Sequence, residues 1–534
     1  MLLSNKTRRP SKEHPSAPLL PSLRPPSDAP QSKSAYENVL DLPDDMLRGI
    51  SLSTLLAGGA RLFARHGAAV REDPQGTYAL SEQCVSLDYF CSHSWTTSRW
   101  QKYLALLVHF NMGRALIATV IMCYACLFIQ LWCPDATPSW MWMKYPIQPD
   151  NAMGTGPTMA EFLLLPTFIF VLCTAHLVGK SRSLFLDIAC IRQDSDAAKA
   201  NGIATLGAVL DRSERMLVMC DAHYFTRLWC VFEVAAYTKR AGAARIDLLP
   251  LHEPLRILGM MADVAFYMTF SSIIFCVLNT VAPELLDYLM GGNFAIMGPV
   301  MWLVLGTPAQ IFVLVAQMEA YRGRRAVSEL VRFTLADAQC HSDSDRAELQ
   351  QLIAKWFTES HEGGEDARRL GFHRFEQFVR HTLAPSVVGS QSFYAKVVIC
   401  IATLALAPVF DTFCSDAITG NHLLGMVAFM MVAIFLVTPF KLLVFHWSAG
   451  CVLALRERCG CPAVPAYVIG VLLNNLSAIG FALTTLSAPN AITDPDYKLP
   501  DDGLDPTARK MFATQVATII AGVTLLAILS NFKI

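Results

Sequence analysis

Long apolar segments constrain this chain more than any other feature of its sequence. A helix needs about 17–25 predominantly apolar residues to cross the hydrocarbon core of a bilayer. Eight segments meet that requirement, namely Ala115–Trp132, Phe162–Val178, Val264–Val281, Phe294–Gln317, Val397–Phe413, Leu423–Phe440, Ala466–Leu486 and Phe512–Phe532. The sequence therefore predicts a mostly α-helical membrane protein with about eight transmembrane helices and the lipid bilayer as a partner.

The composition supports this reading and excludes other classes of protein. Of the 534 residues, 53% are hydrophobic and 16% are charged, whereas soluble domains carry about 25% charged residues. The 43 Lys and Arg residues balance 44 Asp and Glu residues, so the chain lacks the basic excess typical of a nucleic-acid binder. The 16 cysteines are irregularly spaced, which favours free thiols over a secreted disulfide scaffold.

Basic residues predict the orientation in the membrane, because Lys and Arg beside membrane helices stay on the cytoplasmic side. With a cytosolic N-terminus, few basic residues fall on the outer side; they are Lys144, Lys498, Arg509 and Lys510. We therefore expect an integral membrane protein with both termini in the cytosol, in the plasma membrane by default.

This topology divides the chain into parts. Residues 1–35 are rich in Pro, Ser and basic residues and are predicted to be a disordered tail. Residues 86–113 and 181–251 can form one split domain, because the transmembrane hairpin 115–178 between them returns the chain to the same side. The remaining parts are a second transmembrane hairpin at 258–318, a small cytosolic helical segment at 319–395 and a four-helix transmembrane region at 396–534.

The segment 319–395 is predicted to hold two amphipathic helices. Apolar residues recur at helical spacing over 349–357 and again over 375–379. Gly363 and Gly364 separate the two stretches, and Ser344 or Asp345 is expected to cap the first helix.

Strands and helices are expected to alternate in the split domain. A run of β-forming residues leads into the polar turn Ser92–Ser94 and then into a helix. Further strands are predicted over 183–193 and 215–225, and further helices over 202–214 and 226–237. Such alternation implies a parallel α/β sheet with functional groups at the ends of the strands.

In this order the residues resemble the Toll/interleukin-receptor (TIR) domain family. Phe90-Cys91-Ser92-His93-Ser94 is similar to its first box, and Leu186-Asp187 is similar to the strand and acidic residue before its second loop. Gly202-Ile203, followed by further apolar residues, is similar to a family helix, and the run from Arg227 to Glu233 resembles the block that ends in WCxxE. The runner-up fold is another flavodoxin-like nucleotide domain.

The resemblance implies a candidate site. Some TIR domains cleave NAD, and the glutamate matched by Glu233 is catalytic there. Breaking the nicotinamide–ribose bond builds positive charge on the ribose, which a neighbouring carboxylate stabilises. The resemblance also implies that Ser92, His93, Ser94 and Trp95 face Glu233 as ligand-binding residues and that Trp95 stacks on nicotinamide. Asp187 either lines this site or caps its loop.

Simpler roles exist for some of these residues. A glutamate in the first turn of a helix is favourable through the helix dipole alone, and His93 can serve only to hydrogen-bond its turn. Cys340-His341 with Asp343 and Asp345 matches no zinc or calcium loop, so we expect helix capping there and no metal site.

The sequence leaves three functions open. The first is signalling or scaffolding through association of the TIR-like domain with another copy or with other TIR-like domains. The second is a membrane-tethered NAD glycohydrolase that uses Glu233, with NAD as substrate and no certain cofactor. The third is a channel or transporter with a regulatory cytosolic domain, for which Asn474 and Asn475 are the best intramembrane polar candidates.

Overall fold

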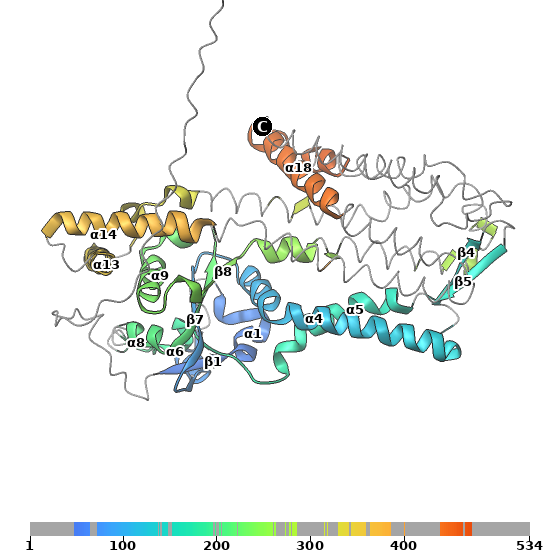
Figure 1. The fold of residues 1–534 in the computed structure, drawn as a ribbon, viewed down its shortest axis with the longest axis horizontal. Helices are drawn as coiled ribbons and strands as arrows, with labels where there is room; N and C mark the ends of the chain where they lie inside the picture. The colour runs from blue at the N-terminus through green and yellow to red at the C-terminus, as the bar shows by residue number, and fades with distance from the viewer. Residues whose placement is uncertain are drawn as a thin grey trace, which may run out of the picture.

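We analysed a computed structural model of the chain (Figure 1). It describes residues 47–64, 72–136, 138, 141–147, 152–157, 159–195, 205–221, 223–259, 329–340, 343–358, 364–385, 438–462 and 465–472, together with isolated positions between them. The predicted tail at 1–35 lies outside these residues.

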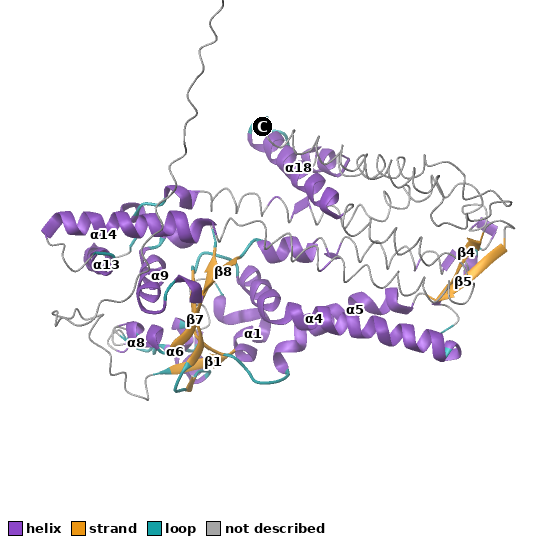
Figure 2. Cartoon of the chain, viewed as in Figure 1, coloured by secondary structure: helices purple, strands orange, loops and turns teal. Residues whose placement is uncertain are grey.

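A six-stranded mixed sheet forms the centre of the described structure (Figure 2). Its strands are β1 (Arg48–Ser51), β2 (Glu82–Gln83), β3 (Leu87–His93), β6 (Ser183–Phe185), β7 (Ser213–Cys220) and β8 (Ile246–Pro250). Their order across the sheet is β2-β1-β6-β3-β7-β8. The four strands from β6 to β8 are parallel, and β1 and β2 extend the β6 edge in antiparallel pairing.

The parallel strands have a doubly wound order. In chain order β3 is first, and it lies between β6 on one side and β7 on the other. The direction of winding therefore reverses between β3 and β7, which defines a topological switch point. Residues 86–113 and 181–251 thus contribute to one sheet, although the α4–α5 hairpin separates them in sequence.

Helices cover both faces of this sheet. The described α-helices are α1 (Leu52–Ala60), α3 (Pro74–Ala79), α4 (Arg99–Trp132), α5 (Met159–Thr174), α6 (Asp187–Cys190), α8 (Leu206–Asp211), α9 (Leu228–Ala241), α13 (Asp343–Trp356), α14 (Gly364–Phe378) and α18 (Thr438–Glu457). The first turns of α4 pack with α1 on one face, around Leu106 and Leu217. Helices α8 and α9 pack on the other face, around Phe90 and Val218.

Helix α4 continues well past the sheet. Its beginning lies at the end of β3, where Lys102 contacts His93, and Phe110 stacks edge-on against Tyr89 further along. The helix therefore runs antiparallel to β3. Its 34 residues span about 51 Å at 1.5 Å per residue, so the apolar part from Ala115 onward extends beyond the sheet.

Helices α4 and α5 form an apolar hairpin (Figure 1). Small residues such as Ala115 and Cys123 on α4 face Leu164 and Phe168 on α5. The opposite face of α4 exposes large apolar side chains, namely Ile117, Ile121, Tyr124, Phe128 and Trp132. A two-stranded ribbon of β4 (Trp142–Ile147) and β5 (Ala152–Pro157) joins the two helices at their far end.

The expectation of a mostly α-helical protein with about eight transmembrane helices is wrong for the described part of the chain. Only α4 and the helical run Met159–Leu177 are long and apolar enough to cross a membrane there. The other six apolar segments lie wholly or largely outside the described residues. The described residues belong mainly to the α/β domain, and within them only these two helices combine the length and the hydropathy that a membrane span needs.

The segment after residue 329 packs against the sheet domain. Helices α13 and α14 form as expected, although α13 begins at Asp343, so Ser344 and Asp345 lie within its first turn. Phe375 lies in an aromatic cluster with Phe333, Phe357 and Phe378. This cluster belongs to the same hydrophobic core as α9 and one face of the sheet. The helical segment is therefore part of the α/β domain.

Candidate functional site

The predicted site residues lie at the carboxyl edge of the sheet. Strand β3 ends at His93 and β7 ends at Cys220, which are the two strands on either side of the switch point. In open α/β sheets, ligands bind in the crevice outside the carboxyl ends of strands at such a point. This edge is the place where the fold favours a ligand.

Glu233 is held in a chain of hydrogen bonds. Helix α9 brings its carboxyl group to β3, where Ser92 Oγ donates to Glu233 Oε2 at 2.5 Å. The hydroxyl of Tyr224 lies 2.5 Å from the same Ser92 Oγ. Ser92 and Tyr224 are buried, whereas Glu233 is partly accessible. The Ser92 hydroxyl therefore holds one carboxyl oxygen of Glu233, and the Tyr224 hydroxyl holds Ser92 in place.

The surroundings of Glu233 favour its neutral form. Burial raises its pKa to about 8, against the opposing effect of the Ser92 hydrogen bond, and the negative charge of Asp187 adds to the rise. A carboxyl group with a raised pKa is largely protonated at neutral pH. A positive charge beside it stabilises its ionised form and lowers its pKa again.

His93 points to the other face of the sheet, since successive side chains of a strand alternate. Its Nε2 atom lies 3.8 Å from Asp187 Oδ1, and its ring packs edge-on against Trp95 with the ring centres 4.3 Å apart. Burial, and then the charge of Lys102, lower the pKa of His93 well below its usual value. His93 is therefore a neutral imidazole at neutral pH.

Lys102 is a fully buried lysine beside this histidine. Its Nζ atom donates to the Ser94 carbonyl oxygen at 2.6 Å and lies 3.2 Å from His93 Nδ1. Burial lowers its pKa to about 8, and nearby acidic groups, first Asp221, oppose the shift. Asp221 follows β7 and accepts a hydrogen bond from Thr97.

The structure thus divides the predicted residues into two groups around one edge. Ser92 contacts Glu233 directly, whereas His93, Trp95 and Asp187 gather on the neighbouring side. Ser92 and His93 lie within β3, and the turn begins only at Ser94. The Ser94 side chain bonds Thr96 Oγ1 at 2.7 Å, and its backbone carbonyl holds Lys102.

Sequence reasoning missed Lys102 and the role of Tyr224. A lysine in the first turn of a helix is normally exposed, so nothing in the sequence marks Lys102 as buried. Tyr224 lies in the short turn between β7 and the run from Arg227 to Glu233 that resembles the TIR family, and this position was the available signal.

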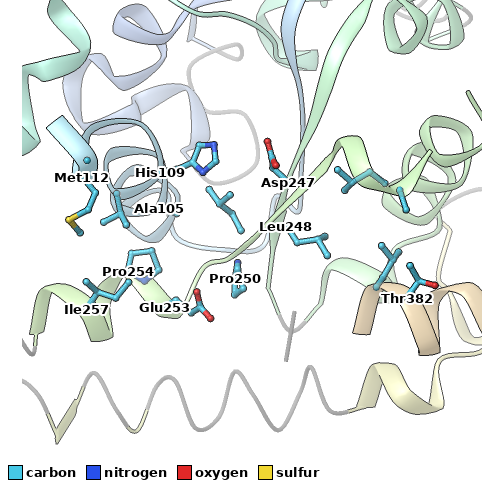
Figure 3. A pocket seen from close by; sticks show the side chains of 16 residues that line it. Ala105, His109, Met112, Asp247, Leu248, Pro250, Glu253, Pro254, Ile257 and Thr382 are labelled. Carbon is cyan, nitrogen blue, oxygen red and sulfur yellow. The ribbon is translucent and has the colours of Figure 1, made fainter. Parts of the chain in front are cut away.

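A separate cavity of about 460 Å³ lies between α4, β8 and the chain that follows β8. His109, Met112 and Asp247 are among its lining residues (Figure 3). Asp247 is already engaged by Arg215 at 2.5 and 2.7 Å. None of the predicted site residues lines this cavity.

Metal ligands are not clustered in the described residues, where no group of three or more His, Cys, Asp or Glu side chains could hold a metal ion. Asp343 and Asp345 lie in the first turn of α13, where acidic side chains favour the helix dipole.

The chain was compared with protein families, curated proteins and solved structures, and none of them matches it.

Proposed function

We propose that the α/β domain hydrolyses the nicotinamide–ribose bond of NAD, with Glu233 as the catalytic carboxylate. The observation that carries the proposal is the placement of Glu233, oriented by Ser92 at 2.5 Å, at the switch point of a doubly wound sheet. The resemblance of residues 86–113 and 181–251 to TIR domains points to the same reaction.

The chemistry suits this site. Nicotinamide leaves as a neutral molecule, so the reaction needs no general acid, and the ribose becomes an oxocarbenium-like cation. Water then adds to the anomeric carbon and releases one proton to the solvent, which gives ADP-ribose. An ionised Glu233 beside that carbon stabilises the cation electrostatically. The pyridinium ring of NAD is itself cationic. Its binding therefore favours the ionised form of a carboxyl group whose pKa burial has raised.

The direct test is nicotinamide release by the purified full-length protein across a range of pH. The pKa of Glu233 is raised to about 8, and the ionised form is the active one. We therefore expect kcat/KM, which reports groups of the free enzyme, to rise about tenfold per pH unit below that pKa and then to level. The kcat profile should be displaced to lower pH, because bound cationic substrate favours the carboxylate.

Two results would contradict this proposal. One is an absence of nicotinamide release at any pH from protein that retains its folded secondary structure. The other is a value of kcat/KM that falls as the pH rises towards 8, since that profile would require the neutral form of Glu233.

We further propose that the α4–α5 hairpin tethers this domain to a membrane. The exposed apolar face of α4 supports a lipid-facing surface, from Ile117 to Trp132. Cys133, the exposed residue that follows α4, should then react with a membrane-impermeant maleimide only from the side opposite the α/β domain. The other accessible cysteines, among them the exposed Cys173 and Cys459, are first replaced by serine. The signal should then disappear in Cys133→Ser, and labelling of Cys133 from the domain's own side would contradict the tether.

Self-association is the second candidate function, and the edge of the sheet favours it. Strand β8 is the last strand on its side among the described residues, and most of it is only half-buried. Such an edge can pair with another copy of the chain. Protein that releases no nicotinamide but forms dimers or larger assemblies by light scattering would favour this function over hydrolysis.

A further inference from the structure

His93 carries a polar atom that the protein itself leaves without a hydrogen bond. The residue is 8% exposed, and its Nε2 atom is buried with no hydrogen-bond partner among the described residues. Asp187 Oδ1 lies 3.8 Å from it, beyond hydrogen-bond range. Buried polar atoms normally have a hydrogen-bond partner, so we infer that His93 Nε2 gains its hydrogen bond when a ligand is bound.

Lys102 determines which nitrogen of His93 carries the proton. An ammonium group has three donors and no acceptor, and Lys102 Nζ lies 3.2 Å from His93 Nδ1. Nδ1 must therefore accept, which places the hydrogen of the neutral ring on Nε2. The second Lys102 hydrogen bond, to the Ser94 carbonyl, anchors the ammonium to the turn.

The resulting Nε2–H donor lies beside Asp187. Lys102 and His93 are buried, whereas the side chain of Asp187 is 46% exposed. Of the three residues Lys102, His93 and Asp187, Asp187 is therefore the one that a ligand can reach. Phe90 pairs with Phe185 in the parallel β3–β6 ladder, so Asp187 follows the end of β6 at the level of Ser92. Ser92 in turn holds the Glu233 carboxyl group, and both carboxyl groups therefore lie at the same edge of the sheet.

We propose that Asp187 binds the vicinal hydroxyl groups of the ribose whose bond Glu233 cleaves, and that Lys102 and His93 are positioning residues that orient the Asp187 carboxylate. The inference rests on the proposed function, since it assumes a ribosyl ligand at Glu233. A carboxylate accepts hydrogen bonds from two neighbouring hydroxyl groups, and an acidic residue plays that part in dinucleotide sites of other doubly wound folds. On binding, the gap between Nε2 and Asp187 closes, as site hydrogen bonds commonly tighten in complexes.

The test compares binding of nicotinamide riboside with binding of its 2′-deoxy analogue by calorimetry, in full-length protein carrying Glu233→Gln so that neither ligand is consumed. We expect this protein to prefer the ribosyl ligand about tenfold or more, because hydrogen bonds to a charged group are strong. Adding Asp187→Asn should reduce the preference to less than about threefold. The matched control is Asp88→Asn, which alters a carboxylate near the start of β3 and should keep the full preference.

The positioning residues are tested by a pair of His93 variants. The side-chain amide of glutamine can replace the Nε2–H donor, whereas leucine cannot. His93→Gln should therefore retain most of the preference for the ribosyl ligand, and His93→Leu and Lys102→Met should lose it. Circular dichroism identifies any variant that fails to fold, and the Gln and Leu pair then decides the outcome.

The outcomes separate this inference from the proposed function. Full preference in Asp187→Asn, equal loss in both His93 variants, or no binding of nicotinamide riboside would overturn the inference. A preference that depends on Asp187 in protein that never hydrolyses NAD would support the inference and refute the proposed hydrolysis.

Discussion

Replacing Glu233 with glutamine should slow nicotinamide release from NAD at least about a thousandfold, which corresponds to about 4 kcal/mol of lost transition-state stabilisation. Glutamine keeps the shape of the side chain and can still accept the hydrogen bond from Ser92. It carries no negative charge, so the cation that develops on the ribose loses its stabilising partner. Single-turnover release of nicotinamide, followed by chromatography, measures the effect directly.

The same substitution should raise the free energy of unfolding or leave it unchanged. Burial raises the pKa of Glu233 in the folded state, so ionisation opposes folding increasingly as the pH rises from the unfolded-state value of about 4.3 towards the folded value. Glutamine cannot ionise, and Glu233→Gln should therefore be at least as stable as the natural protein near pH 8. Glu214→Gln, which alters an exposed glutamate near the start of β7, is the matched control. Unchanged activity in Glu233→Gln would exclude the proposed reaction.

The second large effect concerns the core that joins the helical segment to the sheet. Phe375 is fully buried, and replacing it with alanine should lower the free energy of unfolding by about 3–5 kcal/mol. That loss is a large fraction of the about 5–15 kcal/mol that stabilises a typical domain. Because α14 and the sheet share one core, the whole α/β domain should unfold at lower denaturant concentration. Circular dichroism and tryptophan fluorescence should shift together.

Phe372→Ala provides the matched control for that experiment. Phe372 lies on the same helix and is only partly buried at the margin of the core, so its truncation should cost much less. Separate transitions for the two probes in Phe375→Ala would show that the helical segment and the sheet unfold independently, contrary to this expectation.

Part of the fold follows directly from the sequence. The alternation of apolar strands with helices predicts β3, β7 and α9, because each is a separate apolar run. Strand β7 ends at Cys220, earlier than the predicted end at Phe225, since the chain forms a 3-10 turn from Tyr224. Strand β6 is shorter than expected, since the chain after Phe185 turns into α6 and only three residues pair. Strands β1 and β2 were not anticipated. Their few residues carry no pattern: β1 pairs with the edge of β6, and β2 pairs with β1.

The sequence predicts that the candidate site lies at the carboxyl edge of the sheet, but it does not predict most of the side-chain contacts within the site. Residue order places Ser92 and Asp187 at strand ends, which meet at one edge of a parallel sheet. Glu233 was expected in the first turn of its helix, but α9 begins at Leu228 and its first turn holds no acidic residue. The sequence does not reveal that Ser92 and His93 face opposite sides, because that depends on where β3 ends. Lys102 shows the limit most clearly. Its buried position depends on Phe63 and Trp95, whose rings lie within 5.2 and 5.6 Å of its Nζ atom.

The antiparallel course of α4 beside β3 determines where the site points. The helix starts at the carboxyl edge and passes the opposite end of the sheet before its apolar part begins. The edge that holds Glu233 and Asp187 is therefore the end of the domain remote from the apolar hairpin. If the hairpin lies in a membrane, this edge faces the aqueous phase, so a water-soluble nucleotide can approach it without crossing the lipid surface.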